Sequence, residues 1–192
     1  MIYLPDVINV VYCSSNFFSE VCAVSMTSLF ENNRHLKEIN VYIIDDGICK
    51  ENKDRIQQIS ERYERNVYFL TMPDPSIFFS DNRFTIKTLG HTYARMILGD
   101  VIPENVERII SLDSDTIVLN KIDELWSTEM GDHPIAGVDD CMGKVALVKT
   151  QHLKENSIHC NAGMYLIDLS VWRKENWTKQ FYRYIKGLFD KG

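Results

Sequence analysis

The sequence predicts an α/β fold in which a mostly parallel sheet carries helices on both faces. Short apolar runs bounded by polar or turn-forming residues alternate with longer segments in which apolar side chains recur every three or four residues. Strands that alternate with helices imply right-handed crossovers and a parallel sheet. The 192 residues, 45% of them hydrophobic, suffice for one domain with a sizeable core. We therefore expect a single Rossmann-like domain over residues 1–192.

The first half of the chain predicts a strand, a loop and a helix in a repeating order. An apolar run at residues 7–12 leads into the turn-like segment Cys13-Ser14-Ser15-Asn16, after which apolar residues take helical spacing. The same order follows the run that ends at Asp45-Asp46-Gly47. The expected strands are residues 7–12, 39–44 and 66–70, the expected helices are residues 17–30 and 50–65, and a loop with a short turn is expected over residues 72–81.

The second half predicts one central strand and a less regular continuation. Helical spacing returns at Tyr93, Met96 and Ile97 and stops before Pro103, and a buried strand then runs to Leu112. No repeat or domain linker interrupts the remainder. The expected elements after this strand are a short helix over residues 122–130 capped by Gly131, strands over residues 134–138 and 161–169, and a last helix that Ser170 caps and that reaches about residue 189.

An acid pair, Asp113 and Asp115, stands at the exit of the fourth expected strand. In open α/β sheets ligands bind outside the carboxyl ends of the strands, and two acids one residue apart can turn toward one cation. Carboxylates suit Mn²⁺ or Mg²⁺ better than zinc or copper. The chain has no glycine-rich phosphate loop, so a bound phosphate would need metal or side-chain charge. The alternative is that the two acids only solvate a turn.

Composition limits the classes of function. A net charge of -6 and a pI near 5.4 argue against nucleic-acid binding, which needs a basic face. There is no apolar run of about 18 residues and no leader segment, which predicts a cytoplasmic protein without a transmembrane segment. The five cysteines form no CxxC pair and are typical of reduced thiols. A zinc site built from Cys141, His152, His159 and Cys160 is an alternative whose spacing matches no standard pattern.

Four segments resemble the retaining glycosyltransferases of family 8, which include glycogenin and bacterial lipopolysaccharide galactosyltransferases. They are residues 10–16, residues 92–95, residues 111–118, and the segment from Asn161-Ala162-Gly163 through Trp172-Arg173. Their order and spacing agree over essentially the whole chain. The resemblance implies a GT-A nucleotide-diphospho-sugar transferase fold, a UDP-sugar donor, and Mn²⁺ that bridges the carboxylates of the DxD motif to the diphosphate.

The resemblance also assigns roles to individual residues. Asp113 and Asp115 would be the metal ligands, with Asp113 also near the donor ribose or sugar. Arg95 would contact the donor sugar or diphosphate, Asn161 would hydrogen-bond the donor sugar, and Asp139 would lie on the sugar and acceptor side. Arg95, Asp139 and Asn161 form the expected catalytic set. The expected donor-binding set is Ser14, Ser15, Asn16, Arg95, Asp113, Ser114, Asp115 and Asn161.

Two departures from the family pattern qualify this expectation. Family members often place an aspartate in the first loop to read the uracil, where this chain has Ser14 and Ser15. The later family segments, including the stretch that supplies a third protein ligand to the metal, have no counterpart before Gly192. The chain thus resembles the first two thirds of such an enzyme, and any peripheral membrane contact would fall to the missing C-terminal part.

The expected function is metal-dependent transfer of a hexosyl unit from a UDP-sugar to a hydroxyl of a carbohydrate or glycolipid, with retained configuration. Two alternatives stay open. Asp113-Ser114-Asp115-Thr116 resembles the DxDxT signature of haloacid-dehalogenase-like phosphatases, although that signature has Thr or Val where Ile117 stands and normally ends the first strand of the sheet. The other alternative is a nucleotide-sugar-binding fragment that has lost turnover together with its C-terminal third.

Overall fold

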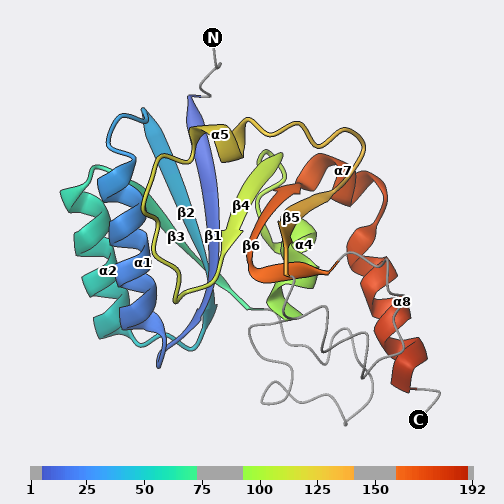
Figure 1. The fold of residues 1–192 in the computed structure, drawn as a ribbon. Coiled ribbons are helices and arrows are strands. Elements are labelled where there is room, and N and C mark those ends of the chain that lie inside the picture. Colours follow the sequence, from blue (N-terminus) through green and yellow to red (C-terminus); the bar gives the residue numbers. More distant parts are fainter. Residues whose placement is uncertain (1–5, 73–92, 141–158, 190–192) are drawn as a thin grey trace.

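A six-stranded sheet forms the centre of the molecule, with strand order β3-β2-β1-β4-β6-β5 (Figure 1). The structure is a computed structural model that describes residues 6–72, 93–140 and 159–189. The strands are β1 (Val7–Ser15), β2 (Glu38–Asp46), β3 (Asn66–Thr71), β4 (Arg108–Leu112), β5 (Ile135–Asp139) and β6 (Cys160–Asp168).

Strand direction confirms the predicted, mostly parallel sheet and adds one reversal. β1, β2, β3 and β4 are mutually parallel, whereas β6 runs antiparallel to β4 and to β5. In consequence β1 to β5 all end at one edge of the sheet, and β6 begins there, with Leu112 opposite Met164 and Asp139 opposite Cys160. The sequence pattern did not indicate that β6 is reversed. This edge brings the expected site residues of four strands together.

Helices cover both faces of the sheet, as predicted. Alternate side chains of β1 point to opposite faces: Val10 and Tyr12 join the core beneath α1, and Val11 joins the core beneath α4 and α7. Figure 1 shows α1 and α2 on one side of the sheet and α4, α7 and α8 on the other. The helices are α1 (Ser19–Asn32), α2 (Lys50–Arg62), the 3₁₀ turn η2 (Arg95–Ile97), α4 (Leu98–Val101), α5 (Asp123–Trp126), α7 (Leu169–Lys174) and α8 (Trp177–Phe189).

The C-terminal helical segment differs from the prediction in two ways. The cap is Asp168 and not Ser170, since the Asp168 carboxylate accepts a hydrogen bond from the Val171 backbone N–H at 3.0 Å. The segment is also two helices, because Asn176 takes the left-handed conformation with φ 56° and turns the chain between α7 and α8. The apolar spacing continues across this break, so periodicity alone could not reveal it.

Other boundaries moved by a few residues. β1 is longer than expected because Ser14 and Ser15 still pair with β2, and α5 ends at Trp126 although the prediction ran to residue 130. Residues 73–81 of the expected loop lie outside the described part of the chain. Among the helices that the structure describes, none has the length and apolarity that crossing a bilayer requires.

Candidate functional site

The acid pair is fixed where β1, β4 and β6 meet. The Asp113 backbone N–H donates to the Gly163 carbonyl of β6 at 2.9 Å, and the Thr116 hydroxyl donates to the Asp113 carbonyl at 2.8 Å. Between the two acids, the buried Ser114 hydroxyl donates to the Cys13 carbonyl of β1 at 2.9 Å. These bonds hold the turn on both sides, so the backbone that carries the carboxylates is set by three strands.

The Asp113 carboxylate is held between Arg95 and Gly163. Arg95 forms an ion pair with Asp113 Oδ1, and the two side chains are 17% and 37% exposed. A Cβ built on Gly163 would lie 3.4 Å from Asp113 Oδ2 and 2.9 Å from Asn161 Oδ1. Asn161 in turn accepts a hydrogen bond from the Gly163 N–H at 2.8 Å. The structure therefore brings together Arg95, Asp113 and Asn161, which are far apart in sequence, and a glycine is what permits the close approach.

Both acids line the same small pocket. The pocket has a volume of about 160 Å³, and its lining is Cys13, Phe18, Asp113, Ser114 and Asp115. Asp115 is exposed, and within the described residues its carboxylate has no hydrogen-bond or ion-pair partner. The described residues contain no group of three or more His, Cys, Asp or Glu side chains arranged to hold a metal. A divalent ion here would take two hard carboxylates from the chain and its other ligands from bound anions or water, which is the usual arrangement for Mg²⁺ beside phosphate.

The positive charge of Arg95 acts on its neighbours in β1 and β6. Burial raises the pKa of the Cys13 thiol to about 12, and Arg95 opposes this rise. Burial likewise raises the pKa of Tyr165, again with Arg95 acting in the opposite direction. The Cys13 thiol at the pocket wall therefore stays protonated at neutral pH and is not a nucleophile.

The first loop lies at the same edge but uses its polar groups internally. Ser14 is buried, and its hydroxyl donates to the Ser15 carbonyl at 3.3 Å. The exposed Asn16 accepts hydrogen bonds through its side-chain oxygen from the Cys49 N–H at 2.9 Å and from Asn52 at 3.1 Å. Asn16 thus fastens the loop to the start of α2, so a ligand would meet a loop of fixed shape.

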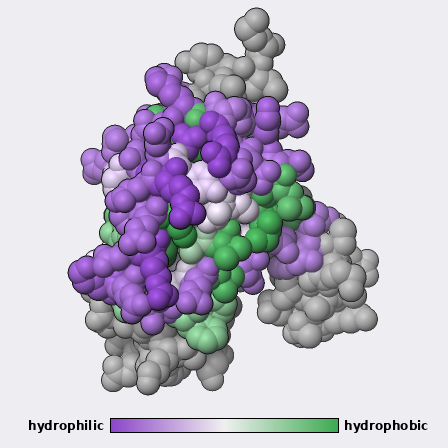
Figure 2. All heavy atoms as spheres, turned by 90° about the vertical axis from the view of Figure 1, so that its left-hand side faces the viewer, coloured by the Kyte–Doolittle hydropathy of each residue, from purple (hydrophilic) through white to green (hydrophobic). Residues whose placement is uncertain are grey.

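Two aromatic residues of this loop were missed in the sequence. Phe17 and Phe18 are 85% and 39% exposed and pack edge to face with ring centroids 5.2 Å apart, and Phe18 lines the pocket. Figure 2 shows apolar side chains gathered in a strip on the side of the molecule that carries α1, where Val21 and Val24 are also exposed. The signal that could have found them is a pair of adjacent aromatic residues shortly after the end of a strand.

Asp139 and Asp140 lie at the end of β5, the outermost strand next to β6. Asp139 ends β5 opposite Cys160, the neighbour of Asn161, across an irregularity in the strand pairing. The Asp140 N–H donates to the His159 carbonyl at 2.7 Å, and the two side chains lie 4.0 Å apart. Of the alternative zinc set, Cys141 and His152 lie outside the described residues.

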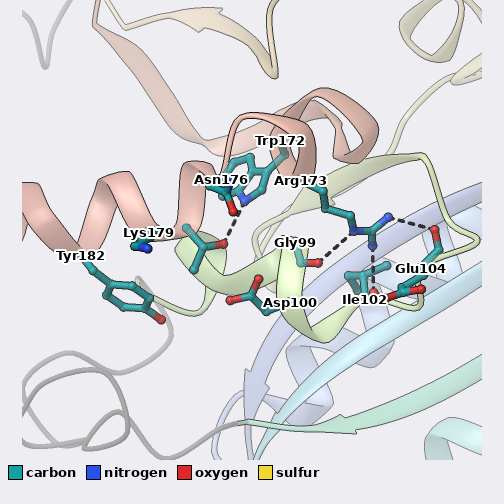
Figure 3. A pocket seen from close by; sticks show the side chains of 10 residues that line it. Gly99, Asp100, Ile102, Glu104, Trp172, Arg173, Asn176, Lys179 and Tyr182 are labelled. Atoms are coloured by element: carbon teal, nitrogen blue, oxygen red, sulfur yellow. Dashed lines mark hydrogen bonds between the residues drawn. The ribbon is translucent and has the colours of Figure 1, made fainter.

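A second, larger cavity lies between α4, α7 and α8 (Figure 3). Its volume is about 860 Å³, yet α7 follows the end of β6 at the edge of the sheet opposite to Asp113. The Arg173 side chain donates to the backbone carbonyls of Gly99, Ile102, Pro103, Glu104 and Val106. The Trp172 indole N–H donates to the Thr178 hydroxyl at 3.0 Å. Trp172 and Arg173, which are part of the family resemblance, therefore hold helices together.

The fold defines the class. The six-stranded, mostly parallel sheet with helices on both faces is of the GT-A type, as its structural neighbours show. The galactosyltransferase LgtC, solved with donor and acceptor sugar analogs, superposes with a TM-score of 0.74 at 22% identity over 90% of this chain and 64% of its own. The bifunctional glycosyltransferase WbbM superposes with a TM-score of 0.79 at 16% identity over 92% of this chain and 34% of its own.

The sequence comparison then identifies the family. The model of glycosyl transferase family 8 matches residues 9–188, and the chain belongs to this family. General stress protein A of Bacillus subtilis is 26% identical over 94% of this chain and 62% of its own length. The lipopolysaccharide 1,3-galactosyltransferase of Salmonella typhimurium is 24% identical over 94% of this chain and 54% of its own. The chain thus spans between half and two thirds of the length of these relatives.

Proposed function

We propose that this chain carries the donor-binding part of a metal-dependent retaining glycosyltransferase, which transfers a hexosyl unit from a UDP-sugar to an acceptor hydroxyl. The observation that carries the proposal is that Asp113 and Asp115 line one pocket at the carboxyl edge, with Arg95 and Asn161 beside Asp113. Family membership supports retention of configuration. The sugar analogs bound to LgtC support a sugar acceptor.

Asp113 and Asp115 are the residues that would hold Mn²⁺ or Mg²⁺. Such an ion, when bound, neutralises the diphosphate and makes UDP a better leaving group. The chain itself contributes the fixed geometry: Ser114 ties the turn to β1, and the Asp113 N–H ties it to β6. Arg95 supplies a planar guanidinium, which suits bidentate contacts with phosphate or sugar oxygens.

The two ends of the donor fall on opposite sides of the acid pair in this proposal. Phe18 at the pocket wall, with Phe17 next to it, offers aromatic surface to the nucleobase, and Asn16 keeps that loop in place. On the other side, Asn161 and Asp139 face the sugar. A carboxylate near the anomeric carbon stabilises the positive charge that develops there, as in other glycosyl chemistry.

Calorimetric titration of UDP with and without Mn²⁺, repeated with Asp113→Ala, tests the proposal. We expect UDP binding to depend on Mn²⁺ and to fall by about 100-fold or more in the variant, because metal charge stabilisation is worth several kcal/mol. Asp54→Ala is the matched control, since it removes an equally charged side chain that pairs with Lys50 on the exposed face of α2. UDP binding that ignores both metal and the Asp113 substitution would refute the site.

Nucleotide-sugar binding without turnover is the alternative for the chain as given. It predicts Mn²⁺-dependent UDP binding with no release of sugar from any UDP-hexose. Because the chain belongs to glycosyl transferase family 8, no observation favours the phosphatase alternative. Hydrolysis of a phosphomonoester by this chain in the absence of nucleotide sugar would restore it.

A further inference from the structure

The two acids of the pocket differ in their surroundings. Asp113 is ion-paired with Arg95, whereas Asp115 has no charged partner among the described residues. The difference follows from their positions. Asp113 directly follows the end of β4, where Arg95 of η2 reaches it, whereas Asp115 lies two residues later in the turn and is exposed. Any cation that uses both carboxylates must therefore meet one open ligand and one that is already neutralised.

Arg95 is anchored at its backbone and carries a long side chain that ends at Asp113. Ala94 before it and Ile97 after it are buried in the core, so η2 cannot shift without disturbing the packing. The side chain is long and single-bonded up to its planar head, and it is partly exposed. The guanidinium can therefore leave Asp113 while the backbone of η2 stays in place.

We infer that Arg95 is a resident counter-charge that competes with the divalent ion for Asp113 and passes to the donor when the ion arrives. This inference rests on the proposed function, because it takes Asp113 and Asp115 as the metal ligands. Arg95 is then a positioning residue before the donor binds: it holds the Asp113 carboxylate beside Gly163 and Asn161. Once the ion holds Asp113, the released guanidinium is available for the diphosphate or the sugar.

Competition of this kind has a definite sign. An opposite charge beside a carboxylate commonly shifts its affinity for another cation, the proton, by one to three decades. Removing the guanidinium should therefore strengthen metal binding in the absence of nucleotide, whereas removing a merely structural contact would weaken it or leave it unchanged. By linkage, a nucleotide that draws Arg95 away from Asp113 raises metal affinity, and this part of the coupling depends on Arg95.

The test is Mn²⁺ binding to the chain, followed by the electron paramagnetic resonance of free Mn²⁺, with and without UDP. For Arg95→Met we expect Mn²⁺ affinity without UDP to rise by about tenfold, the lower end of the range for one neighbouring charge. The factor by which UDP strengthens Mn²⁺ binding should fall by about the same amount. Arg95→Lys, which restores a positive charge, should return both quantities toward those of the unchanged chain.

Arg55→Met is the matched control. It removes an arginine that pairs with Glu51 at 2.7 Å on the exposed face of α2, away from the pocket, and should leave Mn²⁺ affinity unchanged. A second measurement follows the unchanged chain itself: the Nε–Hε proton resonance of Arg95 should shift as Mg²⁺ is added. Arg95→Lys assigns that resonance by its disappearance.

The outcomes separate this inference from the proposed function. If Asp113→Asn binds Mn²⁺ as well as the unchanged chain, the metal site itself is refuted. If Asp113→Asn loses Mn²⁺ but Arg95→Met binds it no more tightly than the unchanged chain, only the counter-charge role is overturned. A resonance of Arg95 that does not move while Mg²⁺ binds would overturn it as well.

Discussion

The two cavities of the molecule differ in what their polar groups are doing. In the large cavity between α4, α7 and α8, the Arg173 guanidinium donates hydrogen bonds to five backbone carbonyls, and the Trp172 indole donates to Thr178. In the small pocket at the strand ends, Asp115 is exposed with no charged partner among the described residues, and Asp113 is ion-paired with Arg95. Arg173 and Trp172 are thus satisfied within the fold, whereas Asp115 keeps its charge available to a ligand.

The difference teaches that an acid pair on a fixed backbone at the strand ends, and not volume, distinguishes the candidate site. A buried polar group that is already hydrogen-bonded stabilises the fold and has little left to offer a ligand. Strand-end carboxylates whose backbone is fixed by neighbouring strands keep their geometry without using their oxygens. The two regions should therefore respond to mutation in opposite ways: the α4–α7–α8 cavity through stability, and the pocket through binding.

The largest effect is expected at the pocket. Asp113→Asn should lower Mn²⁺-dependent UDP affinity by about 100-fold or more, while the free energy of unfolding changes by less than about 1 kcal/mol, as for other partly exposed ion pairs. Calorimetry and urea denaturation measure the two quantities. A large loss of stability with unchanged UDP affinity would reverse the comparison.

Arg173→Met should have the opposite profile. It leaves several partly buried carbonyls without their donor, and we expect a loss of about 3 kcal/mol in the free energy of unfolding. UDP and Mn²⁺ affinity of the folded chain should not change, because α7 follows the edge of the sheet opposite to Asp113. Binding measured at 10 °C together with urea denaturation would check this, and weakened UDP binding at full folding would contradict it.

Gly99→Ala probes the packing of the same region with a single methyl group. A Cβ at Gly99 would lie 2.5 Å from Cδ1 of the Trp172 ring, which is buried and hydrogen-bonded and cannot easily retreat. Overpacking of this kind costs about 2 kcal/mol. Gly187→Ala is the control, because a Cβ there meets nothing within 4 Å. Equal melting temperatures for the two variants would show that α4 can move away from α7.

The smallest effect should come from Ser114→Ala. The substitution removes the hydrogen bond to the Cys13 carbonyl and is expected to cost about 1 kcal/mol of stability. Because the turn between the acids then loses its bond to β1, Mn²⁺ affinity should also fall, by about tenfold, the lower end of the range for residues that orient metal ligands. Ser114→Ala is thus expected to lower both stability and Mn²⁺ affinity. A loss of stability with unchanged Mn²⁺ affinity would show that this hydrogen bond does not orient the metal ligands.

Much of this arrangement was predictable from local sequence. The six strands, α1, α2 and the position of Asp113 at the end of the fourth strand follow from apolar spacing and turn residues, which report only on near neighbours in the chain. The same signals failed where the decisive contact was not local. Asp168, and not the predicted Ser170, caps α7. The left-handed Asn176 ends this helix although the apolar spacing continues beyond it.

The sequence by itself determined the α/β class, the acidic pair at a strand exit and the family, since each is written in residue type and spacing. Only the tertiary structure decided that β6 runs backwards, that Arg95 pairs with Asp113, and that Gly163 and Asn161 stand beside the same carboxylate. The physical reason is that these contacts join residues 18 to 60 positions apart, and their geometry depends on how strands are ordered in the sheet. Spacing along the chain shows which groups are present, and strand order shows which of them meet.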